Sequence, residues 1–365
     1  MTDPSTTDPS TTDQRTTDQT GTRRGTRTKG GVGSPDPSAP LLAVTDLQVE
    51  FRTRYGVAKA VNGVSFSVDE GETLAILGES GSGKSVTAQA IMGIVDSPPG
   101  FVTGGQVRFR GQDLLQMPDE QRRSFRGPHI SMIFQDALSS LNPVFPVGWQ
   151  IGEMFRIHTK VSRREAKKKA IELMDRVRIP GAASRVGDYP HQFSGGMRQR
   201  IMIAMAIALD PEVLIADEPT TALDVTVQAQ VMELLADLQR ESRMGLILIT
   251  HDLGVVADVA DKIAVMYAGR VMEKSPVLDI YANPAHPYTE GLLKSIPRID
   301  AKGGELQAIK GLPPSLTNIP KGCEFRPRCP RAQSVCEAER PPLREVVPGR
   351  FAACHFAEEV LSDHA

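Results

Sequence analysis

The chain has few cysteines, almost no tryptophan and no long apolar segment. Its 365 residues include four cysteines and one tryptophan. The longest wholly apolar stretch, Ile201 to Leu209, is far shorter than the ~20 residues that cross a bilayer. The N-terminus has no apolar core of the kind found in signal peptides. We therefore expect no membrane span, and attachment to a membrane would have to come through partner proteins.

The chain also lacks a strong charge of either sign. It carries 42 basic and 44 acidic residues, which gives a formal net charge of −2. Proteins that bind nucleic acid nonspecifically usually have a basic excess, so we expect no nucleic-acid partner. A length of 365 residues is enough for two or three small domains with a sizeable core.

Residues 1–40 are poor in apolar side chains. They consist mainly of Thr, Asp, Ser, Pro and Gly, with TTD repeated and a short basic patch at Arg23 to Lys29. Such a segment cannot bury enough surface to offset the entropy of ordering, so we expect a disordered N-terminal tail. Interspersed Asp residues argue against a mitochondrial targeting peptide.

The segment GESGSGKS, Gly78 to Ser85, fits the phosphate-loop pattern G-x-x-x-x-G-K-[ST]. It follows the apolar run Thr73 to Leu77 and precedes the helix-like stretch Val86 to Ile94, which is the required context. Glycines let backbone N–H groups converge on phosphate oxygens, and the helix N-terminus attracts the anion. Lys84 is expected to reach the β- and γ-phosphates, and Ser85 to offer its hydroxyl to Mg²⁺. The expected ATP-binding residues of this loop are Gly78, Ser80, Gly81, Ser82, Gly83, Lys84, Ser85 and Val86.

A second apolar run, Val213 to Ala216, is typical of a buried parallel strand and ends in the carboxylates Asp217 and Glu218. Ligands of open α/β sheets lie at the carboxyl ends of the strands. We expect Asp217 beside the Mg²⁺ and Glu218 placed to polarise the water that attacks the γ-phosphate. The alternative is a solvated acidic strand end, which the phosphate loop upstream disfavours.

Strand-like and helix-like segments alternate in the manner of a mostly parallel sheet with crossover helices. Strands are expected at 47–51, 64–68, 73–77, 107–109, 130–134, 213–216, 246–250 and 263–267. Helices are expected at 148–157, 163–177, 197–209 and 225–240, the first three within an inserted segment at about 136–210. The sequence therefore predicts an α/β fold with a helical insertion.

Two further segments, FSGGMRQ at Phe193 to Gln199 and ITHD at Ile249 to Asp252, complete a recognisable set. With the phosphate loop and VLIADEPTTALD, they give the chain a close resemblance to the ATP-binding subunits of ABC transporters over residues 41–296. The resemblance implies a P-loop NTPase (RecA-like) ABC cassette over residues 41–275. It also implies an ATPase, with ATP as substrate and Mg²⁺ as cofactor.

The resemblance assigns roles to individual residues. It implies that Ser194, Gly195 and Gly196 form the signature turn, which acts on ATP bound by a partner cassette. It identifies Gln135, in MIFQD, as the Q-loop residue, a catalytic and magnesium-contacting position, and Asp224 as part of the D-loop. An SGG turn is also an ordinary helix start, and both interpretations can hold because a helix N-terminus can bind phosphate.

The resemblance also implies a catalytic switch histidine and an adenine-stacking aromatic. His251 is at the position of that histidine, although a single His after an apolar strand is more often a core residue. Tyr55, in TRYGVAKAV, lies at the family's usual distance before the phosphate loop for the stacking aromatic. Phe51 is close by and is the alternative, but we expect Tyr55 to fill this role.

From residue 276 onward the sequence changes character. NPAHPYTEGLLKSIP, at Asn283 to Pro297, and the later KGCEFRPRCPRA and CHF resemble the C-terminal extension of subunits that energise oligopeptide and dipeptide importers. The resemblance implies a C-terminal domain over residues 276–365 and import of di- and oligopeptides. Nickel and glutathione importers share much of this architecture and remain alternatives.

The resemblance implies a multisubunit assembly at the cytoplasmic face of the plasma membrane. Because the family binds ATP between two cassettes, we expect a second, non-identical ATP-binding subunit. Two membrane permease subunits and, indirectly, an extracytoplasmic peptide-binding protein complete the set. A soluble ABC ATPase acting on DNA or the ribosome would typically add coiled-coil arms, basic faces or a second cassette. A noncatalytic nucleotide binder is disfavoured by the presence of Lys84, Glu218 and His251.

All the cysteines lie in one C-terminal segment with the spacing C-x₅-C-x₆-C-x₁₇-C: Cys323, Cys329, Cys336 and Cys354. A reducing cytosol disfavours disulfides. Four thiolates suit tetrahedral Zn²⁺ or a [4Fe–4S] cluster, and the spacing lacks the C-x₂-C pairs usual for structural zinc. Resemblance to dipeptide permease ATP-binding subunits, whose C-terminal region is associated with an iron–sulfur cluster, favours the cluster, with zinc as the alternative. Arg326, Arg328 and Arg331 are expected to lower the pKa of the thiols.

The segment DALSSLNPVFPVGWQI, Asp136 to Ile151, combines turn-forming and apolar residues. By family resemblance, the coupling helix of the permease docks here, with Ser139 and Phe145 among the expected contacts. A plain hydrophobic loop is the alternative.

Overall fold

The computed structural model describes residues 39–136, 140–221, 223–295 and 308–363. The chain divides into two units, Met1–Ser34 and Pro35–Ala365, and the second is described below. The expected disordered tail lies outside the described residues up to position 38. No helix within the described ranges is long and apolar enough to span a bilayer.

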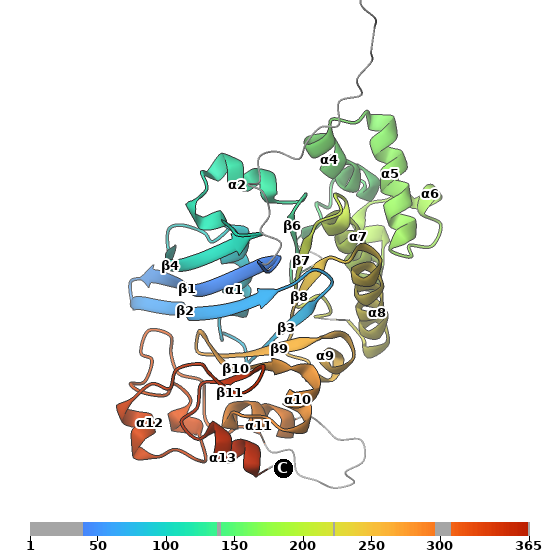
Figure 1. Ribbon diagram of the computed structural model, residues 1–365. Coiled ribbons are helices and arrows are strands. Elements are labelled where there is room, and N and C mark those ends of the chain that lie inside the picture. Colours follow the sequence, from blue (N-terminus) through green and yellow to red (C-terminus); the bar gives the residue numbers. More distant parts are fainter. Residues whose placement is uncertain (1–38, 137–139, 222, 296–307, 364–365) are drawn as a thin grey trace, which may run out of the picture. The chain divides into compact units, whose positions relative to one another are not determined.

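The larger sheet contains eight strands in the described part of the chain: β3 (Thr73–Leu77), β6 (Ile130–Ile133), β7 (Val213–Asp217), β8 (Gly245–Ile249), β9 (Lys262–Tyr267), β10 (Arg270–Pro276), β11 (Arg344–Val347) and β12 (Arg350–Ala352). Their order is β11-β12-β10-β9-β3-β8-β7-β6, and the run from β9 to β6 is parallel (Figure 1). Every residue of β3, β7 and β8 is buried, as expected for strands covered on both faces. The parallel core predicted from the sequence is confirmed.

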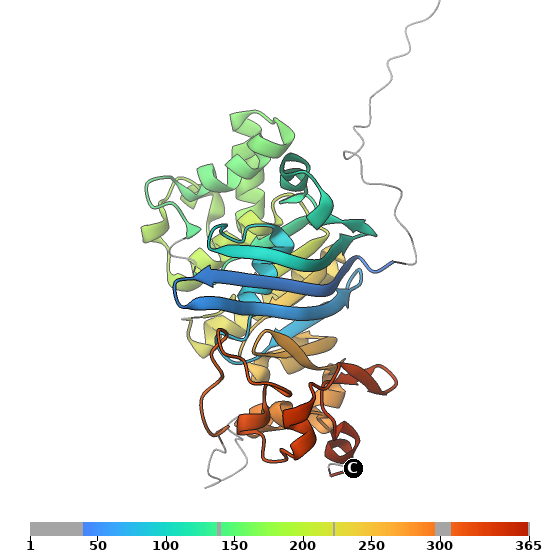
Figure 2. The ribbon, with the colours of Figure 1, turned by 90° about the vertical axis from the view of Figure 1, so that its left-hand side faces the viewer.

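A smaller sheet is formed by β1 (Leu42–Thr53), β2 (Gly56–Val68), β4 (Gly100–Phe109) and β5 (Gln112–Asp113). Its order is β2-β1-β4-β5 and all its pairings are antiparallel. Figure 2 shows its three long strands side by side, in blue and teal. The sequence placed strands here but indicated a mostly parallel sheet. Residue periodicity identifies strands without identifying their partners, so the separate antiparallel sheet was not predicted.

The described helices are α1 (Lys84–Met92), α2 (Asp119–Phe125), α4 (Val147–Thr159), α5 (Arg163–Arg176), α6 (Ala182–Arg185), α7 (Gly195–Ile207), α8 (Val225–Ser242), α9 (Leu253–Val259), α10 (Val277–Ala282), α11 (Pro287–Lys294), α12 (Ser334–Ala338) and α13 (Ala357–Ser362). Short 3₁₀ turns occur at η1 (Leu114–Gln116), η2 (Pro190–Gln192) and η3 (Arg326–Arg328). The helices α4 to α7 occupy the segment 136–210 in which a helical insertion was predicted.

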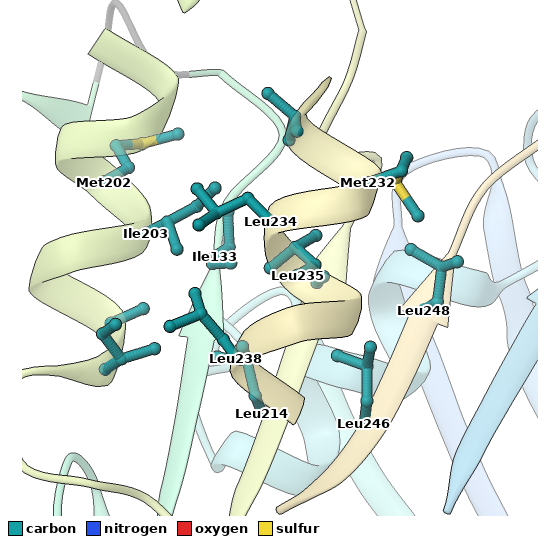
Figure 3. Close-up of a cluster of buried hydrophobic side chains, with 14 of the residues drawn as sticks. Ile133, Met202, Ile203, Leu214, Met232, Leu234, Leu235, Leu238, Leu246 and Leu248 are labelled. Atoms are coloured by element: carbon teal, nitrogen blue, oxygen red, sulfur yellow. The ribbon is translucent and has the colours of Figure 1, made fainter. Parts of the chain in front are cut away.

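Helices α7 and α8 pack against the parallel sheet through buried apolar side chains (Figure 3). Ile203 of α7 and Leu235 and Leu238 of α8 lie against Leu214 of β7 and Leu246 of β8, and none is more than 3% exposed. Burial of such side chains contributes about 1.5–3 kcal/mol each. This packing holds α8 against the sheet directly after the segment that follows β7.

The C-terminal extension shares the sheet of the cassette. β10 pairs with β9 on one side and with β12 on the other, so the expected boundary between residues 275 and 276 falls inside β10. Glu273 of β10 is buried, and its carboxylate accepts hydrogen bonds from the backbone N–H groups of Ala285 (2.7 Å) and His286 (3.0 Å). These bonds attach the loop before α11 to the cassette's own sheet.

Candidate functional site

The phosphate loop connects β3 to α1 and passes close to neighbouring backbone. Gly78 and Gly83 have φ angles of 149° and 102°. A Cβ at Gly78 would lie 2.1 Å from the carbonyl oxygen of Met266, and one at Gly83 would lie 2.3 Å from that of Ala60. Only glycine fits these two positions, for reasons of both dihedral angle and space. The two glycines therefore allow the loop to pass close to the backbone of Ala60 and Met266.

Lys84 lies inside the curve of the loop. Its Nζ donates to the carbonyl oxygens of Gly78 (2.8 Å) and Glu79 (3.1 Å), and the side chain is buried. Burial lowers the pKa of Lys84, while the carboxylates of Glu218, Asp217 and Glu79 act in the opposite direction. Ser82 Oγ is also buried and has no hydrogen-bond partner within the described residues. An ammonium, an unpartnered hydroxyl and a glycine-rich loop suit a phosphate group.

Ser85 and Asp217 meet although they are 132 residues apart in the chain. The Ser85 hydroxyl donates to Asp217 Oδ1 at 3.0 Å, and Asp217 is 4% exposed. Burial raises the pKa of Asp217, and the bond from Ser85 opposes this. A hydroxyl and a carboxylate at the phosphate loop are oxygen ligands of the kind that Mg²⁺ prefers.

The Glu218 carboxylate contacts side chains from its own segment and from two segments distant in sequence. Its Oε2 accepts hydrogen bonds from Gln135 Nε2 (2.7 Å) and Thr221 Oγ1 (3.0 Å), and its Oε1 lies 3.4 Å from His251 Nδ1. The backbone at Glu218 is left-handed, with φ 46°, which is uncommon for a non-glycine residue and typical of functional sites. Sequence reasoning did not identify Thr221, although it lies three residues after Glu218 within TTALD.

His251 is not a core residue. Its side chain is 66% exposed, whereas the preceding Thr250 is buried. Asp252 caps α9 by accepting from the Gly254 N–H (2.9 Å) and also accepts from Gln228 Nε2 (2.7 Å) of α8. The histidine therefore stands at a fixed helix start and faces Glu218, so the core interpretation is excluded.

The signature turn and the D-loop residue lie at the starts of adjacent helices. Ser194 caps α7 by accepting from the Met197 N–H (3.3 Å), and Asp224 caps α8 by accepting from the Val227 N–H (3.0 Å). Gly195 and Gly196 form the first turn of α7, where a Cβ at Gly196 would lie 2.5 Å from Val227 Cγ1. Within the described ranges, no hydrogen bond or ion pair joins these residues to the phosphate loop.

Tyr55 lies in the turn between β1 and β2 and is 75% exposed. The Arg54 guanidinium lies 4.7 Å from the centre of its ring. Phe51, the alternative, is part of β1 and only partly exposed, and it pairs with Gly100 of β4. An exposed ring can stack on a base, so the geometry favours Tyr55.

The sequence of the chain matches a known protein family and known proteins. Residues 61–221 match the family model described as ABC transporter. Over 328 residues the chain is 50% identical to the oligopeptide transport ATP-binding protein OppD of Salmonella typhimurium, covering 90% of this chain and 97% of that protein. The chain belongs to the ABC transporter family. Its resemblance to ATP-binding subunits of this family is thereby confirmed.

Two further relatives are also named as peptide transport ATP-binding proteins. The chain is 52% identical to OppD of Bacillus subtilis over 307 residues, 84% of this chain and 86% of that protein. It is also 52% identical to the dipeptide transport ATP-binding protein DppD of Bacillus subtilis over 301 residues, 82% of this chain and 90% of that protein. Residues 272–336 match the family described as oligopeptide/dipeptide transporter, C-terminal region.

Solved structures confirm the cassette fold. The ATP-binding cassette MJ0796, in a dimer bound to ADP and Pi, aligns with a TM-score of 0.58 at 25% identity, covering 65% of this chain and 98% of that one. CbiO1 from Clostridium perfringens aligns with a TM-score of 0.57 at 27% identity, covering 67% of this chain and 91% of that one. The predicted P-loop NTPase cassette is therefore correct, and the chain is an ABC-type ATPase.

The four predicted cysteine ligands line one small cavity of about 10 Å³ in the C-terminal extension: Cys323, Cys329, Cys336 and Cys354. One backbone N–H group points at a sulfur: that of Phe356 donates to Cys354 Sγ at 3.4 Å. Among the described residues, however, no group of three or more His, Cys, Asp or Glu side chains has the geometry to hold a metal ion.

Arg331 lowers the pKa of Cys329 as expected, but burial has the larger effect on the pKa of the thiols. Burial raises the pKa of Cys323 to about 11 and that of Cys354 to about 12. Burial also raises the pKa of Cys329, and the opposing charge of Arg331 does not overcome it. Two of the arginines are occupied by acidic partners elsewhere: Arg326 pairs with Glu337 and Arg328 pairs with Glu79. Arg326 and Arg328 are close to cysteines in sequence, but their guanidinium groups lie at these carboxylates.

The expected docking segment presents apolar side chains. The rings of Phe145 and Trp149 stack with centres 4.4 Å apart, and each residue is more than a third exposed. A cavity of about 560 Å³ next to Gln135 is lined mainly by apolar side chains, including Phe134, Met154 and Met205. Ser139 lies outside the described residues.

Proposed function

We propose that this subunit hydrolyses ATP to drive the import of di- and oligopeptides through a membrane ABC transporter. The observation that carries the proposal is the identity of about half of all residues to OppD over nearly the full length of that protein, including the C-terminal region. Similarity confined to the cassette would indicate a transport ATPase but would not indicate peptides as the substrate.

The phosphate loop binds the triphosphate, with Lys84 at the β- and γ-phosphates and Ser82 and the loop N–H groups on their oxygens. Ser85, Asp217 and Gln135 would hold Mg²⁺, which when bound neutralises charge on the β- and γ-phosphate oxygens. The existing bond between Ser85 and Asp217 places two of these groups together.

Glu218 orients and polarises the attacking water, and Gln135, Thr221 and His251 keep its carboxylate in position through the contacts described above. His251, exposed beside Glu218, is placed to contact the γ-phosphate side of the site. Tyr55 stacks on the adenine.

The proposed assembly is the one that the resemblance to ABC transporter subunits implies. Ser194, Gly195, Gly196 and Asp224 act on ATP held by a second cassette, which we propose to be a non-identical sister subunit. Two permease subunits contact the exposed Phe145–Trp149 face, and a peptide-binding protein acts on the other side of the membrane. The subunit thus works as a peripheral protein at the cytoplasmic face of the plasma membrane.

Uptake assays test the substrate. Cells that lack this subunit are expected to lose uptake of labelled di-, tri- and pentapeptides, with nickel and glutathione uptake unchanged. The wild-type gene should restore peptide uptake and the Glu218→Gln variant should not. Normal peptide uptake together with lost nickel or glutathione uptake would reject the peptide proposal. Recovery of the subunit with ribosomes or DNA, and not with membranes, would support the rival soluble class.

We further propose that the four cysteines hold a [4Fe–4S] cluster, with Zn²⁺ as the alternative. Four thiols that line one cavity, with a backbone N–H group directed at one of them, support an anionic metal–thiolate group. No group of three or more His, Cys, Asp or Glu side chains among the described residues has metal-holding geometry, so the proposal rests on the shared cavity of the four thiols and on the family resemblance. A cluster there would have a structural or regulatory role because the cavity is lined by none of the hydrolytic residues.

Anaerobic purification is expected to give a brown protein that absorbs near ~400 nm, with roughly four irons per chain, as for Cys₄ cubane clusters. Changing Cys336 to Ser should reduce the iron content, whereas the Glu218→Gln variant should keep it. Stoichiometric zinc without iron, under conditions that protect clusters from oxygen, would replace the cluster with the zinc alternative.

A further inference from the structure

The phosphate loop is bound directly by a residue of the C-terminal extension. Arg328 donates from Nη1 to Glu79 Oε2 (2.6 Å) and from Nη2 to Glu79 Oε1 (2.9 Å), a two-point contact between residues 249 positions apart. The Arg328 side chain is 4% exposed and that of Glu79 is 26% exposed. Paired bonds of this kind are stronger and more directional than single ones, and low exposure protects them from screening.

Two tyrosines reinforce the contact. The Tyr288 hydroxyl of α11 accepts from the Glu79 N–H at 3.0 Å, and the Tyr267 hydroxyl of β9 accepts from Arg328 Nη1 at 3.3 Å. Both rings pack on Phe325, with ring centres 5.2 and 5.4 Å away. The Glu79 N–H is thus bound by α11 and its carboxylate by the extension that follows α11.

The same arginine is part of the four-cysteine segment. Arg328 ends η3, which lies between Cys323 and Cys329, and Cys329 is the next residue. The backbone there is fixed by bonds from the Arg328 N–H to the Phe325 carbonyl (2.9 Å) and from the Cys329 N–H to the Arg326 carbonyl (3.2 Å). The backbone that carries Arg328 is therefore part of the same short hydrogen-bonded turn as that of Cys329.

The charge of Glu79 makes its contact with Arg328 relevant to ATP binding. Glu79 is the second residue of a loop that binds a triphosphate, and its carbonyl oxygen also accepts a bond from Lys84 Nζ at 3.1 Å. A free carboxylate at this point would repel the phosphates across a short distance. Arg328 neutralises that carboxylate and fixes the residue that carries it.

We propose that Arg328 is a positioning residue of the ATP site, and that through it the four-cysteine segment sets the affinity of the phosphate loop for ATP. Arg328 acts by neutralising and holding Glu79. The part of the proposal that concerns the cysteines rests on their proposed role as one ligand-holding site, whereas the contact between Arg328 and Glu79 does not.

The first test measures the affinity of the assembled transporter for a fluorescent ATP analogue, together with KM for ATP and kcat. Arg328→Ala should weaken binding and raise KM about tenfold, the scale of one lost charge-assisted interaction, with kcat at saturating ATP within about twofold. Arg328→Lys should recover part of the affinity. Arg344→Ala is the matched control, since Arg344 makes a similar two-point contact with Glu358 (2.5 and 2.7 Å) in the same extension.

The decisive variant is the double change. Adding Glu79→Gln to Arg328→Ala removes the unneutralised charge and should bring ATP affinity back to within about threefold of wild type. If Arg328→Ala leaves affinity unchanged, or if the double variant binds as weakly as Arg328→Ala alone, Arg328 does not act through Glu79 and the proposal fails.

The second test combines a substitution at the cysteine site with one at the contact between Arg328 and Glu79. Cys336→Ser should weaken ATP binding several-fold in the wild-type background and cause no further loss in the Arg328→Ala background, because the connection is already broken. Equal losses in both backgrounds, or none in either, would overturn the connection between the sites. Iron content and peptide uptake are measured on the same preparations, so failure of the cluster or of the peptide assignment is recognised separately.

Discussion

Glu218→Gln is expected to reduce the ATPase rate of the assembled transporter by about 100-fold or more, while ATP binding is retained. The substitution keeps the shape of the side chain and its place beside Gln135, Thr221 and His251. It removes the carboxylate that polarises the attacking water, and general-base groups contribute roughly 10²–10⁴-fold. Nucleotide affinity and turnover are measured separately to distinguish binding from catalysis.

Glu233→Gln provides the control for this prediction. Glu233 is an exposed residue of α8, 3.4 Å from Arg178 and outside the nucleotide site, so its replacement should leave turnover unchanged. Near-normal turnover in the Glu218 variant would remove Glu218 from its catalytic role. The assay uses the full transporter, because in the proposed assembly two cassettes enclose ATP.

Lys84→Ala is expected to weaken ATP binding about 10- to 100-fold, since the ammonium makes charge-assisted bonds to the phosphates. Lys84 Nζ bonds two carbonyl oxygens of the phosphate loop, which fixes the amine within that loop. Affinity for the fluorescent ATP analogue measures the loss.

Lys168→Ala is the matched control, since Lys168 is exposed on α5 and pairs only weakly with Glu172 at 3.7 Å. A thermal melt of each variant checks that the fold is intact. Unchanged affinity in a folded Lys84→Ala protein would contradict the assignment of Lys84 to the phosphates.

The strongest parts of the site were predictable from local sequence. The loop from Gly78 to Ser85 and the strand ending at Asp217 and Glu218 require particular residues at fixed spacing, because backbone amides, an ammonium and carboxylates must meet one small anion. The strands β3, β7 and β8 were likewise visible as short apolar runs, since strands buried on both faces have no polar alternation.

Several features were beyond the reach of local patterns. The antiparallel sheet of β1, β2 and β4 could not be separated from the parallel one, because alternation reports burial and not partners. Arg328 was assigned to the cysteines on sequence proximity, but its side chain binds Glu79. An arginine side chain is long enough to leave its neighbours, and only packing decides where it goes.

The sequence by itself determined the chemistry of this protein: a phosphate loop, a carboxylate pair, a signature turn and four clustered cysteines. Tertiary structure decided which of these groups work together. It brought Gln135 and His251 to Glu218, joined Ser85 to Asp217 across 132 residues, and bound the phosphate loop to the C-terminal extension through Arg328. Motifs depend on short-range requirements for particular residues, whereas contacts between distant segments depend on the packing of the whole chain.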